Sequence, residues 1–375
     1  MTRALRLGGV AHGGFVVARD EEKVVFVTGG LPGELATVEI TERGKRFDRG
    51  RVVEVLEPAA GRIEPPCPIA GECGGCDWQF ADQETQLDLK TAVVAEQLRR
   101  LAGIEWDGRV EAVPGGLTGW RTRLRFAVDG RGRLGFRARR SHQVIPLPEQ
   151  GCLIAADPPY DEAREVAEPG QEVIVAIGTD SATSLGPRLG IGDDPVHERV
   201  LGRDFDVDAD GFWQVHREAP ETLTRAVLDG LDPRRGESAL DLYCGVGLFA
   251  GALVDAGCDV LGVESGRRAV AQARRNVPQA RFSAAPLERA LHDLPGSVDL
   301  VVLDPPRKGA GASVVRAVAA AGPRAVAYVA CDPSALARDL AYFAEQGYAP
   351  TSIRGFDLFP MTQHIECVAI LMPQG

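Results

Sequence analysis

The sequence contains no run of about 18 apolar residues, the length that a helix needs to cross a bilayer. The first six residues, Met-Thr-Arg-Ala-Leu-Arg, also begin no apolar stretch of signal-peptide length. These absences predict a cytoplasmic protein that engages no membrane, in which the eight cysteines are reduced thiols or metal ligands rather than disulfides. No feature of the sequence indicates an obligate protein partner, so we expect a monomer.

The chain also lacks a net positive charge. Its formal net charge is −11, which argues against simple electrostatic adhesion to nucleic acid. Positive charge is nevertheless concentrated locally. Between residues 121 and 140 a single acid, Asp129, accompanies eight arginines, which are Arg121, Arg123, Arg125, Arg131, Arg133, Arg137, Arg139 and Arg140. A second cluster consists of Arg43, Lys45, Arg46, Arg49 and Arg51. Each cluster fits a solvated surface and equally a contact with RNA.

Three segments with different patterns follow one another. Residues 1–60 carry short strands over 14–18, 23–27, 34–40 and 50–56, separated by turn residues, which is typical of a small β-barrel. Residues 61–203 begin with a proline-rich break, continue with a helix over 82–102 and return to strand-like alternation. Over residues 204–375 strands alternate with helices, which predicts a doubly wound parallel sheet.

The third segment contains a candidate cofactor site. Asp241-Leu242-Tyr243-Cys244-Gly245-Val246-Gly247 joins an apolar strand to a helix, and glycines at such a turn let the backbone approach a ligand closely. The next strand ends in Glu264, about 20 residues later, where a carboxylate can accept hydrogen bonds from ribose hydroxyls. Dinucleotide binding is the competing interpretation. The sequence lacks a true Gly-x-Gly-x-x-Gly, and this favours S-adenosylmethionine.

Two later strands end in chemically useful residues. The strand over 301–303 ends in Asp304-Pro305-Pro306, which places a carboxylate at the same sheet edge. The strand over 325–330 ends in Cys331, and the following helix N-terminus is expected to favour its thiolate. An inert buried cysteine is the plainer interpretation. Carbon methylation of uracil gives the thiol a role, because C5 becomes nucleophilic once a thiolate has added to C6.

That chemistry also requires a base to remove the C5 proton so that the thiol can be eliminated. Glu366 is the candidate, because it lies where a polar loop enters the last apolar strand, over 367–371. On local sequence alone, a surface acid at a strand end explains Glu366 equally well.

A cysteine cluster marks the central segment. Cys67-x5-Cys73-x2-Cys76 lies in a glycine-rich loop, and Cys152 follows far downstream. Four thiols can hold an iron–sulfur cluster or a structural zinc ion, and the spacing does not decide between them.

Taken together, these motifs resemble the RNA uridine-C5 methyltransferase family, in its iron–sulfur branch with an N-terminal TRAM domain. The resemblance spans essentially the whole chain and includes Phe212-Trp213-Gln214-Val215-His216 and His364-Ile365-Glu366. It implies a Rossmann-like class I methyltransferase domain of α/β class, an OB-like TRAM barrel that grips RNA, and a central β-rich domain with a [4Fe–4S] cluster. It further implies S-adenosylmethionine contacts from Gln214, Tyr243, Gly245, Gly247, Glu264 and Asp304. Cys331 would be the nucleophile, Glu366 the base, and the cluster ligands Cys67, Cys73, Cys76 and Cys152.

The sequence departs from the family pattern at His216, Leu248 and Pro286, where asparagine is common. The resemblance implies a loop of ribosomal or transfer RNA as substrate, with ribosomal RNA favoured. Two other functions stay open. Asp304-Pro305-Pro306 suits an amino-group methyltransferase, which needs no thiol, and the barrel would also suit an RNA-binding protein with a vestigial catalytic domain.

Overall fold

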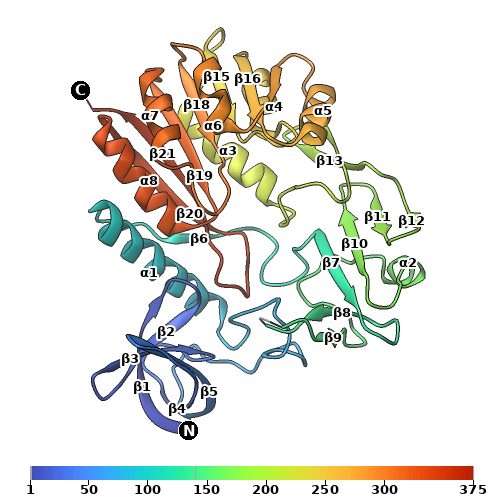
Figure 1. Cartoon of the computed structure of the whole chain (residues 1–375), viewed down its shortest axis with the longest axis vertical. Helices are drawn as coiled ribbons and strands as arrows, with labels where there is room; N and C mark the ends of the chain where they lie inside the picture. Colours follow the sequence, from blue (N-terminus) through green and yellow to red (C-terminus); the bar gives the residue numbers. More distant parts are fainter. Residues whose placement is uncertain (1, 140, 375) are drawn as a thin grey trace.

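The computed structural model describes residues 2–139 and 141–374, so Arg140 of the arginine-rich segment lies outside the described residues. Residues 2–57 form a closed barrel in the order β1-β2-β3-β5-β4, drawn in blue in Figure 1. Its strands are β1 (Thr2–Ala11), β2 (Phe15–Asp20), β3 (Lys23–Thr28), β4 (Leu35–Arg43) and β5 (Phe47–Glu57). Alternate side chains fill the interior, and Val25, Val27 and Val38 are fully buried there. The sequence pattern did not predict β1.

A six-stranded antiparallel sheet, in the order β12-β11-β10-β7-β8-β9, forms the central segment. Its elements are β7 (Arg123–Val128), β8 (Leu134–Arg137), β9 (Val144–Pro146), α2 (Tyr160–Glu165), β10 (Glu172–Ile177), β11 (Ala182–Leu185) and β12 (Gly190–Ile191). Leu124, Phe126 and Val175 form its core. A hairpin of β13 (Val196–Val200) and β14 (Arg203–Val207) leads from this sheet to the next. Arg123 of β7 pairs with Glu198 of β13 at 2.8 Å, which fastens the hairpin to the sheet.

An eight-stranded sheet in the order β17-β16-β15-β18-β19-β21-β20-β6 forms the largest part of the molecule. Its strands are β6 (Val110–Ala112), β15 (Ser238–Leu242), β16 (Asp259–Glu264), β17 (Arg281–Ala284), β18 (Leu300–Leu303), β19 (Ala325–Ala330), β20 (Tyr348–Asp357) and β21 (Glu366–Pro373). The five strands from β17 to β19 are parallel, as predicted, but β21 runs antiparallel to both of its neighbours. The predicted parallel sheet is therefore interrupted at β21 alone, since β20 and β6 again run in the direction of β19.

Helices cover both faces of this sheet. The helices are α1 (Gln83–Ala102), α3 (Ala219–Leu231), α4 (Leu248–Asp255), α5 (Arg267–Asn276), α6 (Leu287–Ala290), the 3-10 turn η1 (Leu291–Asp293), α7 (Ala312–Ala320) and α8 (Pro333–Glu345). One core lies under α3, α4 and α5, and the other lies under α1, α6, α7 and α8. Because helices cover both faces of the sheet, the central strands need apolar side chains at successive positions, and β19 is buried along its whole length.

The domain bounds expected at residues 60 and 203 remain a prediction, but two elements between them pack elsewhere. α1 packs against α8, and β6 adds the last strand to the eight-stranded sheet, beside β20. Within the described residues, no helix is long and apolar enough to span a bilayer.

Candidate active site

Three neighbouring strands bring Cys331, Asp304 and Glu366 together. Cys331 directly follows β19, which lies between β18 and β21. Ala330 pairs with Cys367 in the antiparallel register, so one further step places Glu366, the first residue of β21, across from Cys331. Asp304 follows the end of β18 on the other side. The two residues predicted to be catalytic are thus adjacent, with a predicted cofactor residue beside them.

The surroundings of Cys331 disfavour its thiolate. Burial of the half-buried thiol, together with the nearby carboxyls of Glu366 and Asp304, raises the pKa of Cys331 to about 12. Arg307 acts in the opposite direction. The expected contribution of the helix N-terminus, which favours the thiolate, stays a prediction, and burial and these carboxyls act against it. α8 starts two residues beyond Cys331, and the charge of Asp332, between Cys331 and the helix, also disfavours the thiolate.

Glu366 is almost fully buried. Burial, reinforced by the charge of Asp304, raises the pKa of Glu366 well above its ordinary value. Burial also raises the pKa of Asp304 to about 7. A carboxyl group with a raised pKa is a stronger base when it ionises, which suits Glu366 to proton removal.

The loop before Glu366 is held by polar side chains of α1 that sequence reasoning missed. Lys90 is fully buried and pairs with Asp357 at 2.5 Å, and it also donates to the carbonyl of Phe359 at 3.0 Å. One turn earlier, Gln86 accepts from the backbone N–H of Met361 at 2.8 Å. Polar residues one turn apart inside an apolar helix face were the available signal, but the same spacing also occurs on exposed faces.

The backbone of the predicted cofactor turn adopts a conformation that leaves room for a ligand. Tyr243, Gly245 and Gly247 have positive φ angles of 65°, 53° and 95°. A Cβ built on Gly245 would meet no atom within 4 Å, so this position faces open space, whereas one on Gly247 would lie 3.2 Å from Val277. Glu264 ends the adjacent strand and accepts the Gly245 N–H at 3.4 Å. The turn and the acid therefore meet, as the sequence predicted.

Asp241 leaves a buried oxygen without a partner beside this turn. Asp241 is fully buried, and its Oδ2 accepts the Ala250 N–H at 2.8 Å. Its Oδ1 has no hydrogen-bond partner among the described residues. Burial is the main reason that the pKa of Asp241 rises to about 7, and the charge of Asp304 adds to it. A cationic or hydrogen-donating ligand would satisfy such a group.

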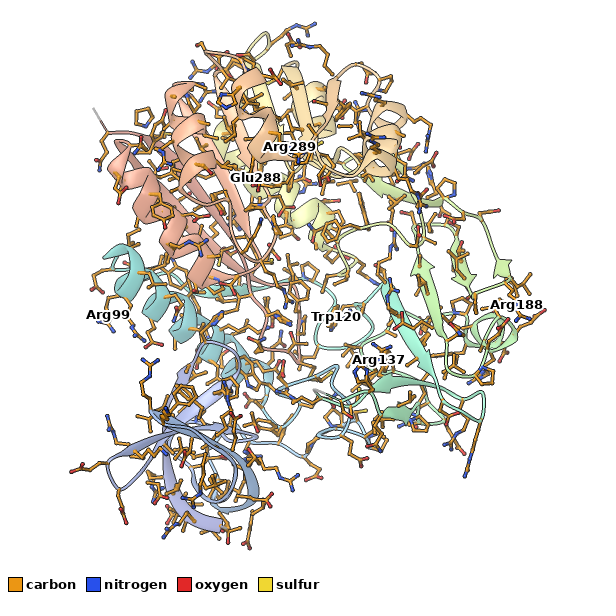
Figure 2. The ribbon with its side chains drawn as sticks, in the orientation of Figure 1. Arg99, Trp120, Arg137, Arg188, Glu288 and Arg289 are labelled. Carbon is orange, nitrogen blue, oxygen red and sulfur yellow. The ribbon has the colours of Figure 1, made fainter. Side chains whose placement is uncertain are left out.

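Gln214 is buried in the segment between β14 and α3. Nearby, His216 is fully buried and stacks on Trp120, labelled in Figure 2, with ring centroids 5.5 Å apart. Its Nδ1 accepts the Glu218 N–H at 3.0 Å, and burial lowers its pKa to about 4. The lowered pKa favours the neutral imidazole at neutral pH, and the buried Nε2 of His216 has no hydrogen-bond partner among the described residues. Of the other two departures, Leu248 is buried at the start of α4, and Pro286 precedes α6.

The four predicted metal ligands line one cavity of about 150 Å³, although Cys152 is distant in sequence. Burial raises the pKa values of Cys73, Cys76 and Cys152, and that of Cys76 reaches about 12. Arg121 also lines the cavity. Across residues 2–139 and 141–374, no three His, Cys, Asp or Glu side chains are grouped closely enough to hold a metal ion as they stand. The thiols therefore share a cavity without the spacing of a single-ion site.

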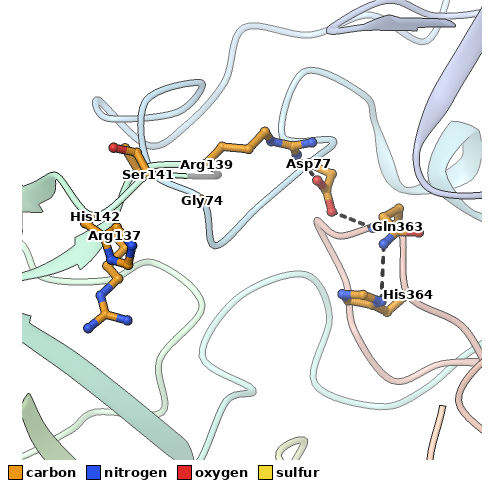
Figure 3. Close-up of a pocket in the computed structure, with 9 residues that line it drawn as sticks. Gly74, Asp77, Arg137, Arg139, Ser141, His142, Gln363 and His364 are labelled. Carbon is orange, nitrogen blue, oxygen red and sulfur yellow. Dashed lines mark hydrogen bonds and ion pairs between the residues drawn. The ribbon is translucent and has the colours of Figure 1, made fainter. Parts of the chain in front are cut away.

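A polar cavity of about 560 Å³ lies beside the loop that leads to Glu366 (Figure 3). Arg137 and Arg139 of the arginine-rich segment line one side of it, together with His142 just beyond that segment, and Gln363 and His364 line the other. Asp77 joins the two sides, because it pairs with Arg139 and accepts the Gln363 N–H. Part of the arginine-rich segment thus lies next to the loop that leads to Glu366.

Comparison with known proteins identifies the family. Residues 195–374 match the family described as tRNA (uracil-5-)-methyltransferase, and residues 3–53 match the TRAM domain. An RNA methyltransferase of Streptomyces coelicolor is 46% identical, over 98% of this chain and 92% of that protein. The chain belongs to the RNA uracil-C5 methyltransferase family. The 23S rRNA (uracil(1939)-C(5))-methyltransferase RlmD of Alkalilimnicola ehrlichii is 31% identical over 99% of the chain and 96% of its own length.

The fold agrees with this assignment. The Pyrococcus abyssi tRNA (uracil-54, C5)-methyltransferase, solved with S-adenosyl-L-homocysteine, superposes with a TM-score of 0.76 at 23% identity, over 99% of this chain and all of that one. The expectation of a class I methyltransferase domain with a TRAM barrel is confirmed. An RNA uracil-C5 methyltransferase uses S-adenosylmethionine, and the family assignment favours uracil C5 over the amino-group alternative.

Proposed function

We propose that this methyltransferase modifies C5 of a uridine in ribosomal RNA, with Cys331 as nucleophile and Glu366 as base. The observation that carries the mechanism is the register of β19 and β21, which sets the thiol and a buried carboxyl side by side. The ribosomal substrate is inferred from the RlmD relative. We also propose that the protein acts on this RNA in the cytoplasm and as a monomer.

The residues of the cofactor turn suit S-adenosylmethionine, whose sulfonium and ammonium groups are cations. Glu264 would accept the ribose hydroxyls, and Gly245 and Gly247 would admit the ligand to the backbone of the turn beside Tyr243. Gln214, buried in the segment before α3, is proposed as a further cofactor contact. The buried carboxyls of Asp241 and Asp304 suit the cationic groups, because each is costly to ionise without a counter-charge. When bound, S-adenosylmethionine supplies an electrophilic methyl group.

The reaction begins with transfer of the Cys331 proton to solvent water. The thiolate adds to C6 of the uracil, and the new S–C6 bond moves the electron pair of the C5–C6 double bond into an enolate, which makes C5 nucleophilic. C5 takes the methyl group as the bond from methyl to sulfonium sulfur breaks. Glu366 removes the C5 proton, the double bond re-forms, and Cys331 leaves C6 as thiolate. The raised pKa of Glu366 gives it the basicity for this step.

The polar cavity of Figure 3 suits the RNA strand that carries the target base. Arg137, Arg139 and His142 offer donors for phosphate oxygens, next to the loop that leads to Glu366. Uridine C5 is inaccessible within an A-form helix, so a base extruded from a loop is the substrate that fits this arrangement.

The test is in vitro methylation with isotopically labelled S-adenosylmethionine, followed by mass spectrometry of nucleosides from separate ribosomal and transfer RNA fractions. We expect labelled 5-methyluridine in ribosomal RNA, and none with Cys331→Ala. Label confined to transfer RNA would refute the substrate. Label on an amino group, with activity retained by Cys331→Ala, would refute the chemistry.

We also propose that Cys67, Cys73, Cys76 and Cys152 hold a [4Fe–4S] cluster. A zinc ion with Zn–S bonds of about 2.3 Å needs four sulfur atoms about 3.8 Å apart, whereas the iron and sulfide atoms of a cluster keep its ligand sulfurs farther apart. The four thiols line one cavity although Cys152 is distant in sequence, which supports a shared centre, and the resemblance to the iron–sulfur branch favours the cluster over zinc. Arg121 in the cavity wall would offset part of the thiolate charge.

Protein purified without oxygen should be brown, absorb broadly at about 400 nm and carry about four iron and four sulfide per chain. Cys152→Ser should lose iron, whereas Cys258→Ser, in a buried cysteine outside the cavity, should keep it. A colourless protein with one zinc ion per chain would refute the cluster.

A further inference from the structure

The barrel contacts the catalytic centre through the short turn between β1 and β2. His12 in this turn places its Nε2 3.0 Å from Oδ2 of Asp332, the residue that follows Cys331. Two residues later, a Cβ on Gly14 would lie 2.9 Å from Cβ of Gln363, in the loop that leads to Glu366. One barrel turn therefore packs on the segments that carry both proposed catalytic residues.

Asp332 links this contact to the nucleophile. Its Oδ1 accepts the Ala335 N–H at 2.8 Å and caps α8, while its Oδ2 receives His12. The charge of Asp332 disfavours the thiolate of Cys331, as do those of Glu366 and Asp304, while Arg307 favours it. The hydrogen bond to Asp332 raises the pKa of His12, so His12 is protonated to a higher pH than an ordinary histidine. A protonated His12 offsets one of the charges that hold the proton on Cys331.

We propose that His12 is a positioning residue through which the TRAM barrel controls thiolate formation at Cys331. The inference rests on the proposed role of Cys331 as nucleophile. His12 acts through Asp332, by supplying a positive charge beside the Cys331 turn. The RNA-binding barrel thereby contributes to catalysis. Its contact with the methyltransferase domain affects the rate of the chemical step as well as the affinity for RNA.

The experiment measures covalent adduct formation on denaturing gels, with S-adenosylmethionine and a ribosomal RNA transcript that contains 5-fluorouridine in place of uridine. Fluorine cannot leave as the proton does, so the adduct accumulates. The rate at saturating RNA and the half-saturating RNA concentration are measured between pH 6 and 9 for wild type, His12→Ala and His12→Gln. Arg3→Ala is the control, because it removes another ion pair of the barrel, with Asp20.

We expect both His12 variants to lower the saturating rate about three- to tenfold near pH 7, a size set by the partial exposure of the pair. The half-saturating RNA concentration should stay within about twofold. The difference in saturating rate between wild type and the His12 variants should decrease towards pH 9, because wild-type His12 is then neutral. Arg3→Ala should match wild type in both quantities.

Unchanged saturating rates in both His12 variants would overturn the inference. So would a deficit that is equal at every pH, which would indicate a merely structural contact, or an effect on the half-saturating concentration alone. If wild type binds the RNA but forms no adduct, the proposed function itself fails and the inference falls with it. Melting temperatures of the variants check that the exposed substitutions leave the fold intact.

Discussion

Replacement of Asp241 by asparagine should make the ligand-free protein more stable at pH 8. Burial moves the pKa of Asp241 from 3.8 to about 7, a rise of about three units, and each unit corresponds to about 1.4 kcal/mol. Ionised Asp241 therefore costs the fold about 4 kcal/mol above pH 7. Asparagine keeps an acceptor for the Ala250 N–H but buries an amide without a partner, which costs about 1–3 kcal/mol. The expected net gain at pH 8 is about 1–3 kcal/mol.

The sign of the pH dependence follows from the raised pKa. Between about pH 4 and pH 7 folded Asp241 holds a proton that the unfolded chain has released, so stability falls as the pH rises through this window. Asp304, whose pKa is also raised to about 7, contributes in the same direction. The melting temperature of wild type should therefore decrease from pH 5 to pH 8, and that of Asp241→Asn should decrease less.

The assay is thermal unfolding at both pH values, with Asp259→Asn, an exposed strand-end acid, as the control that should follow wild type. Calorimetry should also show S-adenosylmethionine binding more tightly to wild type at pH 8 than at pH 6, and more weakly to Asp241→Asn at pH 8. The reasoning fails if Asp241→Asn melts below wild type at pH 8, or if its melting temperature has the full wild-type pH dependence.

Other substitutions test the framework around the site. Lys90→Met should destabilise the protein by about 3–5 kcal/mol in denaturant unfolding, because it leaves Asp357 buried without its partner. Lys90→Met combined with Asp357→Asn should recover part of that loss, and no recovery would contradict the pairing argument. On the barrel, the Arg49 guanidinium lies 5.3 Å from the ring of Phe15 and 5.6 Å from that of exposed Phe47, a surface suited to stacking with bases. Phe47→Ala should weaken RNA binding several-fold in filter-binding titrations, and unchanged affinity would remove this surface from the RNA interface.

Much of the fold follows from local sequence pattern. The predicted helix over 82–102 and the strand over 325–330 match α1 and β19 almost residue for residue, because their apolar spacing leaves little choice. The glycine turn and Glu264 meet because parallel strands end at one sheet edge.

Long-range features had no local signal. The direction of β21, which places Glu366 beside Cys331, depends on pairing with β19 and β20. The support of the catalytic loop by Lys90 depends on α1 packing against the catalytic domain. The pKa of Cys331 is raised by burial and by Glu366 and Asp304 from two other strands, which no local pattern around Cys331 predicts.

The most direct test of the proposed mechanism is the fate of the covalent adduct in Glu366→Gln. Without the base, addition to C6 and methyl transfer should proceed but elimination should not. The variant should therefore accumulate a methylated protein–RNA adduct that survives denaturing electrophoresis and is identified by mass spectrometry at Cys331. Cys331→Ala/Glu366→Gln should form none, and Cys258→Ala/Glu366→Gln should form as much as the single variant. Turnover by Glu366→Gln at the wild-type rate, or an adduct that persists without Cys331, would contradict the assignment of nucleophile and base.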